Sequence, residues 1–441
     1  MRFDELNLNK PLLTVLEELQ YVHPTTIQQR GFPVIMSGRD VVGIAQTGTG
    51  KTMAYLLPIL RQWEFSKTKT VKVLILVPTR ELVAQVVQVA KELSTYITVR
   101  VEGVYGGSNI APQVAMLAEG VDILVATPGR LIDLSLRGAV KLNWVKRLVI
   151  DEVDEMLGLG FRHQLTTVLN LLPVKKQSLM FSATMTEDVE ALIQQYFNNP
   201  VLIEAAPTGT PLSNIVQHGY AAPNFYTKVN LLELLLSDAR EYKKVLVFAA
   251  TKKLADQLFE QIEEKFPGQI GIIHSNKSQN NRFDTVRKFE DGTYRALIAT
   301  DVIARGLDIA EVSHVINFDI PDEPENYIHR IGRTGRADRA GIAITFVTPK
   351  ETELQERIEA LMNYKIPMEP LPDDLEIATR LTKEESAQPE TLNIQDKFEH
   401  KPTGAAFHEK KEKNKKVPSR ISHAQKMRMK YGKPKTRGQK K

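Results

Sequence analysis

Residues 45–52, Ala-Gln-Thr-Gly-Thr-Gly-Lys-Thr, have the types and spacing of a loop that binds phosphate. Apolar runs lie on both sides, which predicts a strand before the loop and a helix after it. Gly48 and Gly50 let the backbone turn its N–H groups toward an anion, and the start of the helix adds the positive end of its dipole. Lys51 supplies a point charge for the outer phosphates, and the Thr52 hydroxyl is suited to bind magnesium. A nucleoside triphosphate is the predicted ligand.

Two adjacent carboxylates, Asp151 and Glu152, follow the apolar run 147–150. A carboxylate at the end of a buried strand is costly unless it meets a cation, and a magnesium ion on Thr52 and phosphate oxygens would be that cation. Glu152 is suited to orient or deprotonate a water for attack on the γ-phosphate. The alternative is an acidic helix N-cap, because Asp and Glu favour first turns. The phosphate loop upstream favours the catalytic interpretation.

Arg330, Arg333 and Arg336 are spaced by three, which predicts one shared face of a helix or tight turn. Arginine stays charged and binds phosphate as a fork, so these residues suit a transition state that needs positive charge. A solvated basic face is the alternative. It does not account for Gly332 and Gly335, which cost helix stability and suggest close approach to a backbone or a ligand.

Two series of strand-like apolar runs alternate with helical patterns along the chain. They comprise 72–77, 99–104, 121–125, 147–150 and 178–181, then 245–248, 270–273, 296–299, 314–318 and 342–346. This alternation predicts α/β architecture, with parallel sheets, helices on both faces and ligands at the carboxyl ends of strands. We predict a first domain over 1–206, a linker at 207–212, a second domain over 213–372 and a disordered tail over 373–441. Arginines on one domain and a phosphate loop on the other imply a site that is completed by closure.

Positive charge is concentrated in the predicted tail. Residues 400–441 hold fifteen lysines and arginines against two glutamates, whereas 373–399 hold eight acids against three bases. A terminal basic run is typically a disordered arm whose partner is a polyanion. The absence of cysteine excludes disulfides and cysteine nucleophiles. The chain also starts without a basic leader and has no apolar run of membrane-spanning length, so we expect a cytoplasmic protein.

With these motifs in this order, residues 3–365 resemble a DEAD-box RNA helicase of superfamily 2, and residues 329–336 match its motif in full. The resemblance implies two tandem RecA-like domains that close around ATP and magnesium and bind RNA across both. The implied nucleotide-binding residues are Tyr21, Gln28, Ala45, Gln46, Thr47, Gly48, Thr49, Gly50, Lys51, Thr52, Asp151, Asp308, Arg333 and Arg336. The implied metal ligands are Thr52 and Asp151, and the implied catalytic residues are Lys51, Glu152, Arg333 and Arg336.

Further roles follow from the same resemblance. Tyr21 would pack on adenine near a second aromatic residue, Phe3, and Gln28, an amide able to pair with a donor and an acceptor, would read the base edge. Asp308 would hold the ribose. Residues that couple the acidic motif to closure are Asp154, Ser182 and Thr184, with Asp154 as the partner of the other two. Implied RNA contacts are Arg80, Gly107, Thr127, Arg130, Gln279, Arg282, Thr300 and Arg305.

Some positions depart from the family pattern. Val153 replaces the usual Ala of the acidic signature, and its added methyls would cost about 1–3 kcal/mol if the neighbours were unchanged. Both flanking carboxylates are present, so we expect hydrolysis to persist. Gln20 stands where the family generally has Gly, and Tyr21 stands where it generally has Phe. Ile303 and Leu307 are apolar variants with no evident chemical effect.

The resulting prediction is a monomeric ATP-dependent RNA helicase that locally unwinds short RNA duplexes or remodels RNA–protein complexes. Core contacts to phosphates and 2′-hydroxyls imply little sequence preference, and the basic tail would act as a tether. An RNA-binding ATP-gated clamp or scaffold with little unwinding is the alternative from another class. A DNA helicase of the same superfamily is disfavoured by the motifs. Protein partners in ribosome assembly or RNA decay are compatible with the family.

Overall fold

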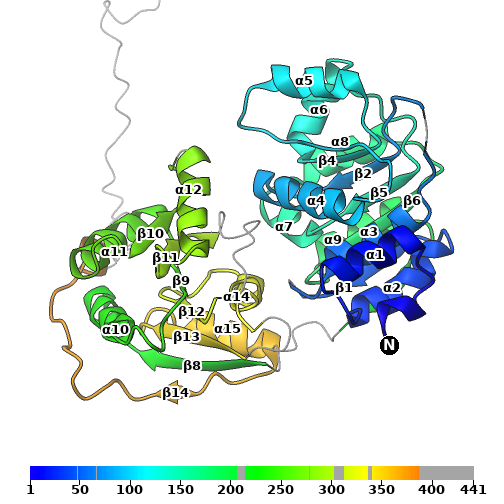
Figure 1. Ribbon diagram of the computed structural model, residues 1–441. Helices are drawn as coiled ribbons and strands as arrows, with labels where there is room; N and C mark the ends of the chain where they lie inside the picture. The colour runs from blue at the N-terminus through cyan, green and yellow to red at the C-terminus, as the bar shows by residue number, and fades with distance from the viewer. Residues whose placement is uncertain are drawn as a thin grey trace, which may run out of the picture. The chain divides into compact units, whose positions relative to one another are not determined.

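The computed structural model describes residues 1–46, 48–65, 67–205, 214–277, 279–301, 312–335 and 340–386 (Figure 1). The predicted linker at 207–212 and the tail from residue 387 lie outside these ranges. Six positions named above also lie outside them, namely Thr47, Ile303, Arg305, Leu307, Asp308 and Arg336. Within the described part of the chain, no helix combines the length and the apolar character needed to cross a membrane.

The first half of the chain builds a sheet of seven described strands, all paired in parallel. They are β1 (Val41–Ile44), β2 (Val73–Leu76), β3 (Val101–Val104), β4 (Ile123–Ala126), β5 (Arg147–Ile150), β6 (Gln177–Ser182) and β7 (Val201–Glu204). Their spatial order is β3-β4-β2-β5-β6-β1-β7. The strand that leads into the phosphate loop therefore lies beside β6, and β5, which leads into the acidic pair, lies on the other side of β6.

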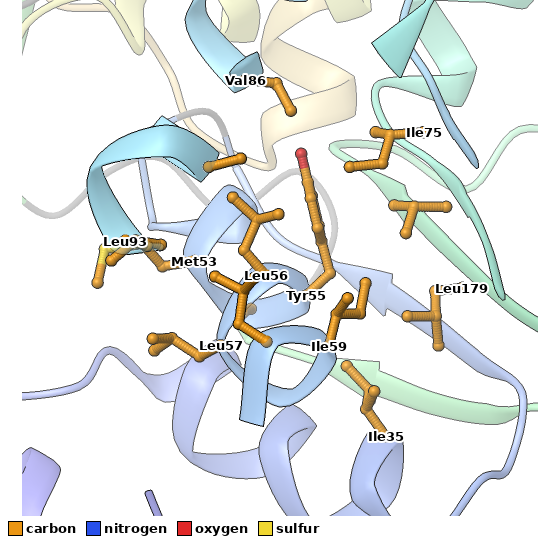
Figure 2. Packing of buried hydrophobic residues seen from close by; sticks show 14 of the residues in the cluster. Ile35, Met53, Tyr55, Leu56, Leu57, Ile59, Ile75, Val86, Leu93 and Leu179 are labelled. Carbon is orange, nitrogen blue, oxygen red and sulfur yellow. The ribbon is translucent and has the colours of Figure 1, made fainter. Parts of the chain in front are cut away.

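Helices cover both faces of this sheet because its strands are apolar on both sides. One face packs against α1 (Lys10–Glu18), α2 (Thr26–Met36), α3 (Lys51–Arg61) and α4 (Arg80–Leu93), together with the short helix η1 (Phe3–Glu5). The other packs against α5 (Ile110–Glu119), α6 (Pro128–Leu136), α7 (Val153–Gly158), α8 (Arg162–Leu171) and α9 (Glu187–Tyr196). Successive strand residues alternate between these cores, so Val41 faces the first and Val42 the second. Figure 2 shows the first core around α3.

The second half repeats the strand order of the first. Its strands are β8 (Ile215–Ala221), β9 (Val245–Phe248), β10 (Ile270–Ile273), β11 (Ala296–Ala299), β12 (His314–Asn317), β13 (Gly341–Val347) and β14 (Met368–Glu369). They pair in parallel in the order β10-β11-β9-β12-β13-β8-β14, which is the order of the first sheet with each strand number raised by seven. The two halves thus share one architecture, and the predicted α/β class with two tandem RecA-like domains is confirmed.

The second sheet is also covered on both faces. Helices α10 (Phe225–Ser237) and α11 (Lys252–Lys265) share one core, while α12 (Gln279–Glu290), α14 (Pro324–Ile331) and α15 (Thr352–Met362) pack on the other face. Strand residues again alternate between the two sides, with Val245 and Leu246 in different cores. Both faces are closed by chain-local helices, so each half has the layers of an independent domain.

The segment that follows the second domain corrects the predicted start of the tail. Leu375 is buried against the core shared by α10 and α11. The amide of Asn224 donates to the carbonyl of Ala378 at 2.6 Å, and Glu385, in the short helix α16 (Lys383–Ser386), accepts from the backbone N–H of Phe225 at 2.7 Å. Residues 373–386 therefore pack on the second domain, because they form hydrogen bonds with the start of α10 and bury an apolar side chain. The prediction of disorder from residue 373 was wrong for this stretch.

Candidate nucleotide and RNA site

The loop between β1 and α3 has the backbone that a phosphate cradle requires. Gly48 and Gly50 both have φ of 83°, in the left-handed region that glycine adopts without penalty. Gly50 is the N-cap of α3, and Lys51 is the first helical residue. The first turn of α3 therefore presents its free N–H groups at this loop.

Lys51 is buried, and its ammonium group has no hydrogen-bond partner among the described residues. Burial raises the pKa of both Asp151 and Glu152, and the Lys51 charge opposes that rise, so the three groups lie within electrostatic reach. A buried cation without a hydrogen-bonded anion is unfavourable, and the phosphates of a nucleotide would supply that anion. The loop and its lysine therefore fit a nucleoside triphosphate.

Gln28 connects the start of α2 to this loop. Its Oε1 accepts from the backbone N–H of Thr25 at 2.9 Å, and its Nε2 donates to the Gly50 carbonyl at 3.0 Å. A side chain at Gly50 would collide with the Gln28 amide nitrogen. One N–H and one lone pair of the amide are left for a base edge. Gln28 is thus hydrogen-bonded directly to the phosphate loop, a contact that the sequence analysis did not predict.

The two aromatic residues of the predicted adenine site differ in exposure. Phe3 is buried in the first core, whereas Tyr21 is 49% exposed and therefore accessible to a ligand. Gln20, which precedes Tyr21 in the sequence, has φ of 60°, a backbone conformation that residues other than glycine rarely adopt. A glycine would adopt this conformation without penalty, whereas Gln20 is strained.

Asp151 follows β5 and is held from two sides. Its Oδ1 accepts from the backbone N–H of Glu152 at 3.0 Å, and its Oδ2 accepts from the Tyr55 hydroxyl at 3.0 Å. Burial raises the pKa of Asp151, and Lys51 and Tyr55 partly offset that rise. The carboxylate is fixed in place and keeps lone pairs for a cation.

Glu152 has φ of 52° and precedes α7, but its side chain makes no capping hydrogen bond. The N-cap alternative for this side chain is therefore excluded. Burial raises the pKa of Glu152 to about 7, although Lys51 and Arg333 oppose the rise. Its Oε2 has no hydrogen-bond partner in the described chain. A carboxyl group with a pKa near neutrality is suited to take a proton from water.

Asp154 makes the contact with the loop after β6 that the family resemblance implied. Its Oδ2 accepts from the backbone N–H of Ala183 at 3.0 Å, and from the backbone N–H and hydroxyl of Thr184 at 2.8 and 2.9 Å. Burial alone would raise the pKa of Asp154, but the charges of His329 and Lys51 and these hydrogen bonds hold it below its usual value. Ser182 is fully buried at the end of β6, and among the described residues its hydroxyl has no partner.

His329 brings the second domain to the acidic segment. Its Nδ1 lies 2.5 Å from Glu155 Oε1, and its Nε2 lies 3.7 Å from Asp154 Oδ2. All three side chains are at least nine-tenths buried. The sequence analysis gave no role to His329 or Glu155. The motif at 329–336 contains the histidine, but it does not show which residue the histidine contacts.

Arg330 and Arg333 do not lie on one helix, because helix α14 ends at Ile331, before Arg333. A tight turn, which the spacing also allowed, joins them, and in it the backbone N–H of Arg333 donates to the Arg330 carbonyl at 3.1 Å. The third arginine, Arg336, lies outside the described residues. Arg330 is 2% exposed, and its guanidinium pairs with Asp301 at 2.6 and 2.8 Å and lies over the Phe248 ring. Arg330 therefore holds the second domain together, whereas the charge of Arg333 acts on Glu152.

Gly335 fits the expectation of a close approach to another backbone. It has φ of 64°, and an added Cβ would lie 3.3 Å from the Asn214 carbonyl oxygen and 2.5 Å from Ile215. The glycine therefore allows the chain to pass the start of β8.

Four predicted RNA contacts of the first domain lie together at the carboxyl ends of neighbouring strands. Gly107 has φ of 76°, and a side chain there would lie 3.0 Å from the Arg80 guanidinium. The Thr127 hydroxyl accepts from the N–H of Gly106 at 3.4 Å, which ties the two loops. Arg130 donates to the Ser108 carbonyl at 2.8 Å, and its Nε and Nη1 are buried without hydrogen-bond partners in the described ranges. This cluster is suited to hold a phosphate backbone.

The predicted RNA contacts of the second domain are only partly described. Gln279 begins α12, and Thr300 follows β11 and is buried. Arg282 is buried on α12 and donates to Glu81 of the first domain at 2.5 Å. In this structure Arg282 therefore contacts protein, and the nearby Glu81 was not singled out from the sequence.

A phosphate loop with an acidic pair on one parallel sheet, and a second sheet of the same strand order that carries arginines, define a nucleoside triphosphatase with two RecA-like domains. Two family descriptions match the chain, DEAD/DEAH box helicase over residues 25–192 and helicase conserved C-terminal domain over residues 227–338. The chain is 39% identical over 364 residues to the DEAD-box ATP-dependent RNA helicase CshA of Geobacillus kaustophilus, which covers 82% of this chain and 77% of the relative. The chain belongs to the family of DEAD-box ATP-dependent RNA helicases.

Solved structures agree with this membership. The structure of S. cerevisiae Dbp5 bound to RNA and ADP BeF3 is similar with a TM-score of 0.76 and 30% identity, covering 84% of this chain and 95% of that one. The DEAD-box helicase Mss116 bound to ssRNA and UDP-BeF is similar with a TM-score of 0.78 and 28% identity, covering 86% and 81%.

Proposed function

We propose that this chain hydrolyses ATP and uses the cycle to open short RNA duplexes locally or to remodel RNA–protein complexes. The environment of the Glu152 carboxyl group is the main observation that supports the proposal. Its pKa is raised to about 7 by burial, and the charges that oppose the rise come from Lys51 of the first domain and Arg333 of the second. A general base flanked by cations from both domains fits hydrolysis that depends on closure.

The chain's own residues divide the chemistry among them. Lys51 and the N–H groups of the loop bind the phosphates, while Tyr21 and Gln28 select adenine. Thr52 and Asp151 would hold magnesium, which when bound would neutralise phosphate charge and polarise the γ-phosphate. Glu152 takes a proton from the attacking water. The catalytic arginines are Arg333 and Arg336, which stabilise the charge that develops on the γ-phosphate.

RNA would be held by its backbone across both domains. The first domain would contribute Arg80, Gly107, Thr127 and Arg130. The second domain would contribute Gln279, Arg282, Thr300 and Arg305. Such contacts go to phosphates and 2′-hydroxyls, so sequence preference is weak. The hydrogen bonds between Asp154 and Thr184, beside Ser182, support a route by which the nucleotide state reaches the RNA site. Asp308 would hold the ribose.

Steady-state hydrolysis by the full-length protein tests this function. ATP turnover is measured without nucleic acid, with single-stranded RNA, and with DNA of the same sequence. We expect RNA, but not DNA, to stimulate ATP turnover strongly. In a second assay, we expect the protein to separate the strands of a short RNA duplex. Stimulation by neither polymer, with RNA still bound, would favour an RNA-binding clamp or scaffold. Equal stimulation by both would favour a helicase without selectivity for RNA.

The basic segment from residue 400 is proposed as a tether that adds RNA affinity without specificity. We further propose that the protein acts as a monomer in the cytoplasm. A sedimentation measurement with and without RNA tests the first point, and fractionation of cells tests the second.

A further inference from the structure

Tyr55 lies on α3, four positions after Lys51, and is completely buried. Its ring packs in the first core among aliphatic side chains such as Leu56, Ile59 and Ile75, with the hydroxyl oxygen at its tip (Figure 2). The ring centroid is 5.4 Å from that of Phe181. A phenol in an apolar core needs hydrogen-bond partners for its oxygen, and the choice of those partners is informative.

The hydroxyl holds one side chain of the proposed metal site. It donates to Asp151 Oδ2 at 3.0 Å, and both residues are buried. A phenolic oxygen has one proton, and in this structure the Asp151 carboxylate receives it.

This bond helps to set the orientation that the Asp151 carboxylate needs in order to hold a cation. Asp151 is held on its Oδ2 by Tyr55 and on its Oδ1 by the N–H of Glu152, so it cannot rotate freely. Groups that orient metal ligands in this way strongly affect metal affinity.

We infer that Tyr55, whose hydroxyl holds Asp151, is a positioning residue for the magnesium that accompanies ATP. This inference rests on the proposed function and adds to it a residue that acts through the proposed ligand Asp151. It separates two roles of α3, whose first turn binds phosphate while its second turn orients a metal ligand.

The competing interpretation is that the hydroxyl only satisfies a buried phenol. Tyr55→Phe keeps the ring and removes only the oxygen, so it distinguishes the two. The matched control is Tyr220→Phe, which removes a mostly buried hydroxyl of the second domain that contacts Glu369 at 2.9 Å. Both variants lose one hydrogen bond from a tyrosine to a carboxylate, and only Tyr55→Phe changes a contact of the metal site.

The experiment titrates magnesium into full-length protein with a fluorescent ATP analogue and follows analogue binding. Affinity in the presence of EDTA is measured first, because it requires the folded phosphate loop but no metal. We expect Tyr55→Phe to bind the analogue as the parent does in EDTA, and to need about tenfold more magnesium for half-maximal enhancement, the low end for loss of an orienting partner. Tyr220→Phe should match the parent in both measurements.

Other results would overturn the inference in distinguishable ways. An unchanged magnesium midpoint in Tyr55→Phe, with RNA-stimulated hydrolysis intact in the parent, would leave the hydroxyl a packing role and the proposed function standing. A loss of affinity in EDTA equal to the loss in magnesium would assign Tyr55 to the phosphate loop itself. A parent whose analogue binding ignores magnesium would contradict the proposed function, and with it the role of Tyr55.

Discussion

Arg282 on α12 donates to the carboxylate of Glu81 on α4 at 2.5 Å, and both side chains are buried. The same Glu81 oxygen lies 3.7 Å from Nε of Arg80. Arg80 and Arg282 are both predicted RNA contacts, one on each domain. Burial lowers the pKa of Arg282, and Glu81 partly offsets that effect. The Glu81 carboxylate therefore lies close to two arginines that an RNA phosphate would need as partners.

Replacing Glu81 with Gln should raise RNA affinity in the absence of nucleotide by about threefold to tenfold, because the pair that RNA must displace is weakened. Fluorescence anisotropy with a short single-stranded RNA measures the change. Glu102→Gln is the control, since Glu102 belongs to an exposed pair with Lys91 on the same domain. A fall in affinity for Glu81→Gln would mean that Glu81 orients the arginines toward RNA and does not compete with it.

Glu152 should make hydrolysis depend on pH near neutrality. Its pKa is raised from 4.5 to about 7 by burial, so the basic form that accepts a proton is gained as the pH rises through about 7. The RNA-stimulated rate should rise over that interval. Glu152→Gln should lower the rate about a hundredfold or more and retain ATP and RNA on the protein. Turnover at the parent rate would remove Glu152 from its assigned role.

The same shift has a consequence for stability. The raised pKa means that the folded state favours protonated Glu152, so this contribution is complete below pH 4.5 and is lost as the pH rises through about 7. Because glutamine does not ionise, Glu152→Gln should lose less melting temperature than the parent between pH 5 and pH 8. Parallel curves for the two proteins would show that the carboxyl group is not strained.

The strained backbone at Gln20 predicts a stabilising substitution. Its φ of 60° is costly for a residue with a side chain, whereas glycine adopts it freely. Gln20→Gly should therefore stabilise the protein by about 0.5–1 kcal/mol in urea unfolding, after the greater flexibility of unfolded glycine is taken into account. Gln88→Gly, in the exposed part of α4, should destabilise it by about 1 kcal/mol. The same sign for both variants would contradict this explanation.

Residues whose roles depend on local chain order could be predicted from the sequence. The phosphate loop follows β1 and the acidic pair follows β5, and parallel strands bring their carboxyl ends together, so Lys51, Asp151 and Glu152 meet as expected. The contact of Asp154 with Thr184 was also expected, because family spacing relates the two motifs. Patterns along one strand or loop carry this information.

Contacts that depend on where a neighbouring element ends could not be predicted in the same way. The spacing of three predicted one face of a helix or a tight turn for the arginines, and it did not show that α14 ends at Ile331 or that a turn follows. It also gave no sign that the Arg330 guanidinium pairs with Asp301. The contact of the Tyr55 hydroxyl with Asp151 could not be predicted, because Tyr55 lies in an apolar helix, where an aromatic ring suggests only packing. The pairing of Glu81 with Arg282 joins residues far apart in the sequence, and neither shows a local sign of the other.

Val153 can be tested as a core residue rather than a catalytic one. Its side chain is completely buried in the second core of the first domain, next to Met156 in the same helix. Val153→Ala should destabilise the protein by about 1–3 kcal/mol through the cavity it leaves. The rate of RNA-stimulated hydrolysis should stay within about twofold, since both carboxylates remain and each additional factor of ten would require 1.4 kcal/mol of barrier. A faster variant with unchanged stability would show that Val153 crowds the site.

Two truncations separate the packed segment from the basic arm. A chain that ends at Ser386 keeps the packed residues and loses the fifteen basic residues beyond 400. It should unfold like the full-length protein but bind RNA more weakly, with a smaller dependence on salt because fewer counterions are released. A chain that ends at Pro372 also loses burial of Leu375 and the hydrogen bonds to Asn224 and Phe225. This second chain should lose a further ~2–4 kcal/mol of stability.

The measurements are urea unfolding and RNA affinity at several salt concentrations for the three lengths. Equal stability of the chains ending at Pro372 and at Ser386 would mean that residues 373–386 add no net stability to the second domain. Equal salt dependence with and without the arm would mean that its lysines and arginines do not contact RNA phosphates. Because the first comparison depends on packing and the second on counterion release, each can fail without affecting the other.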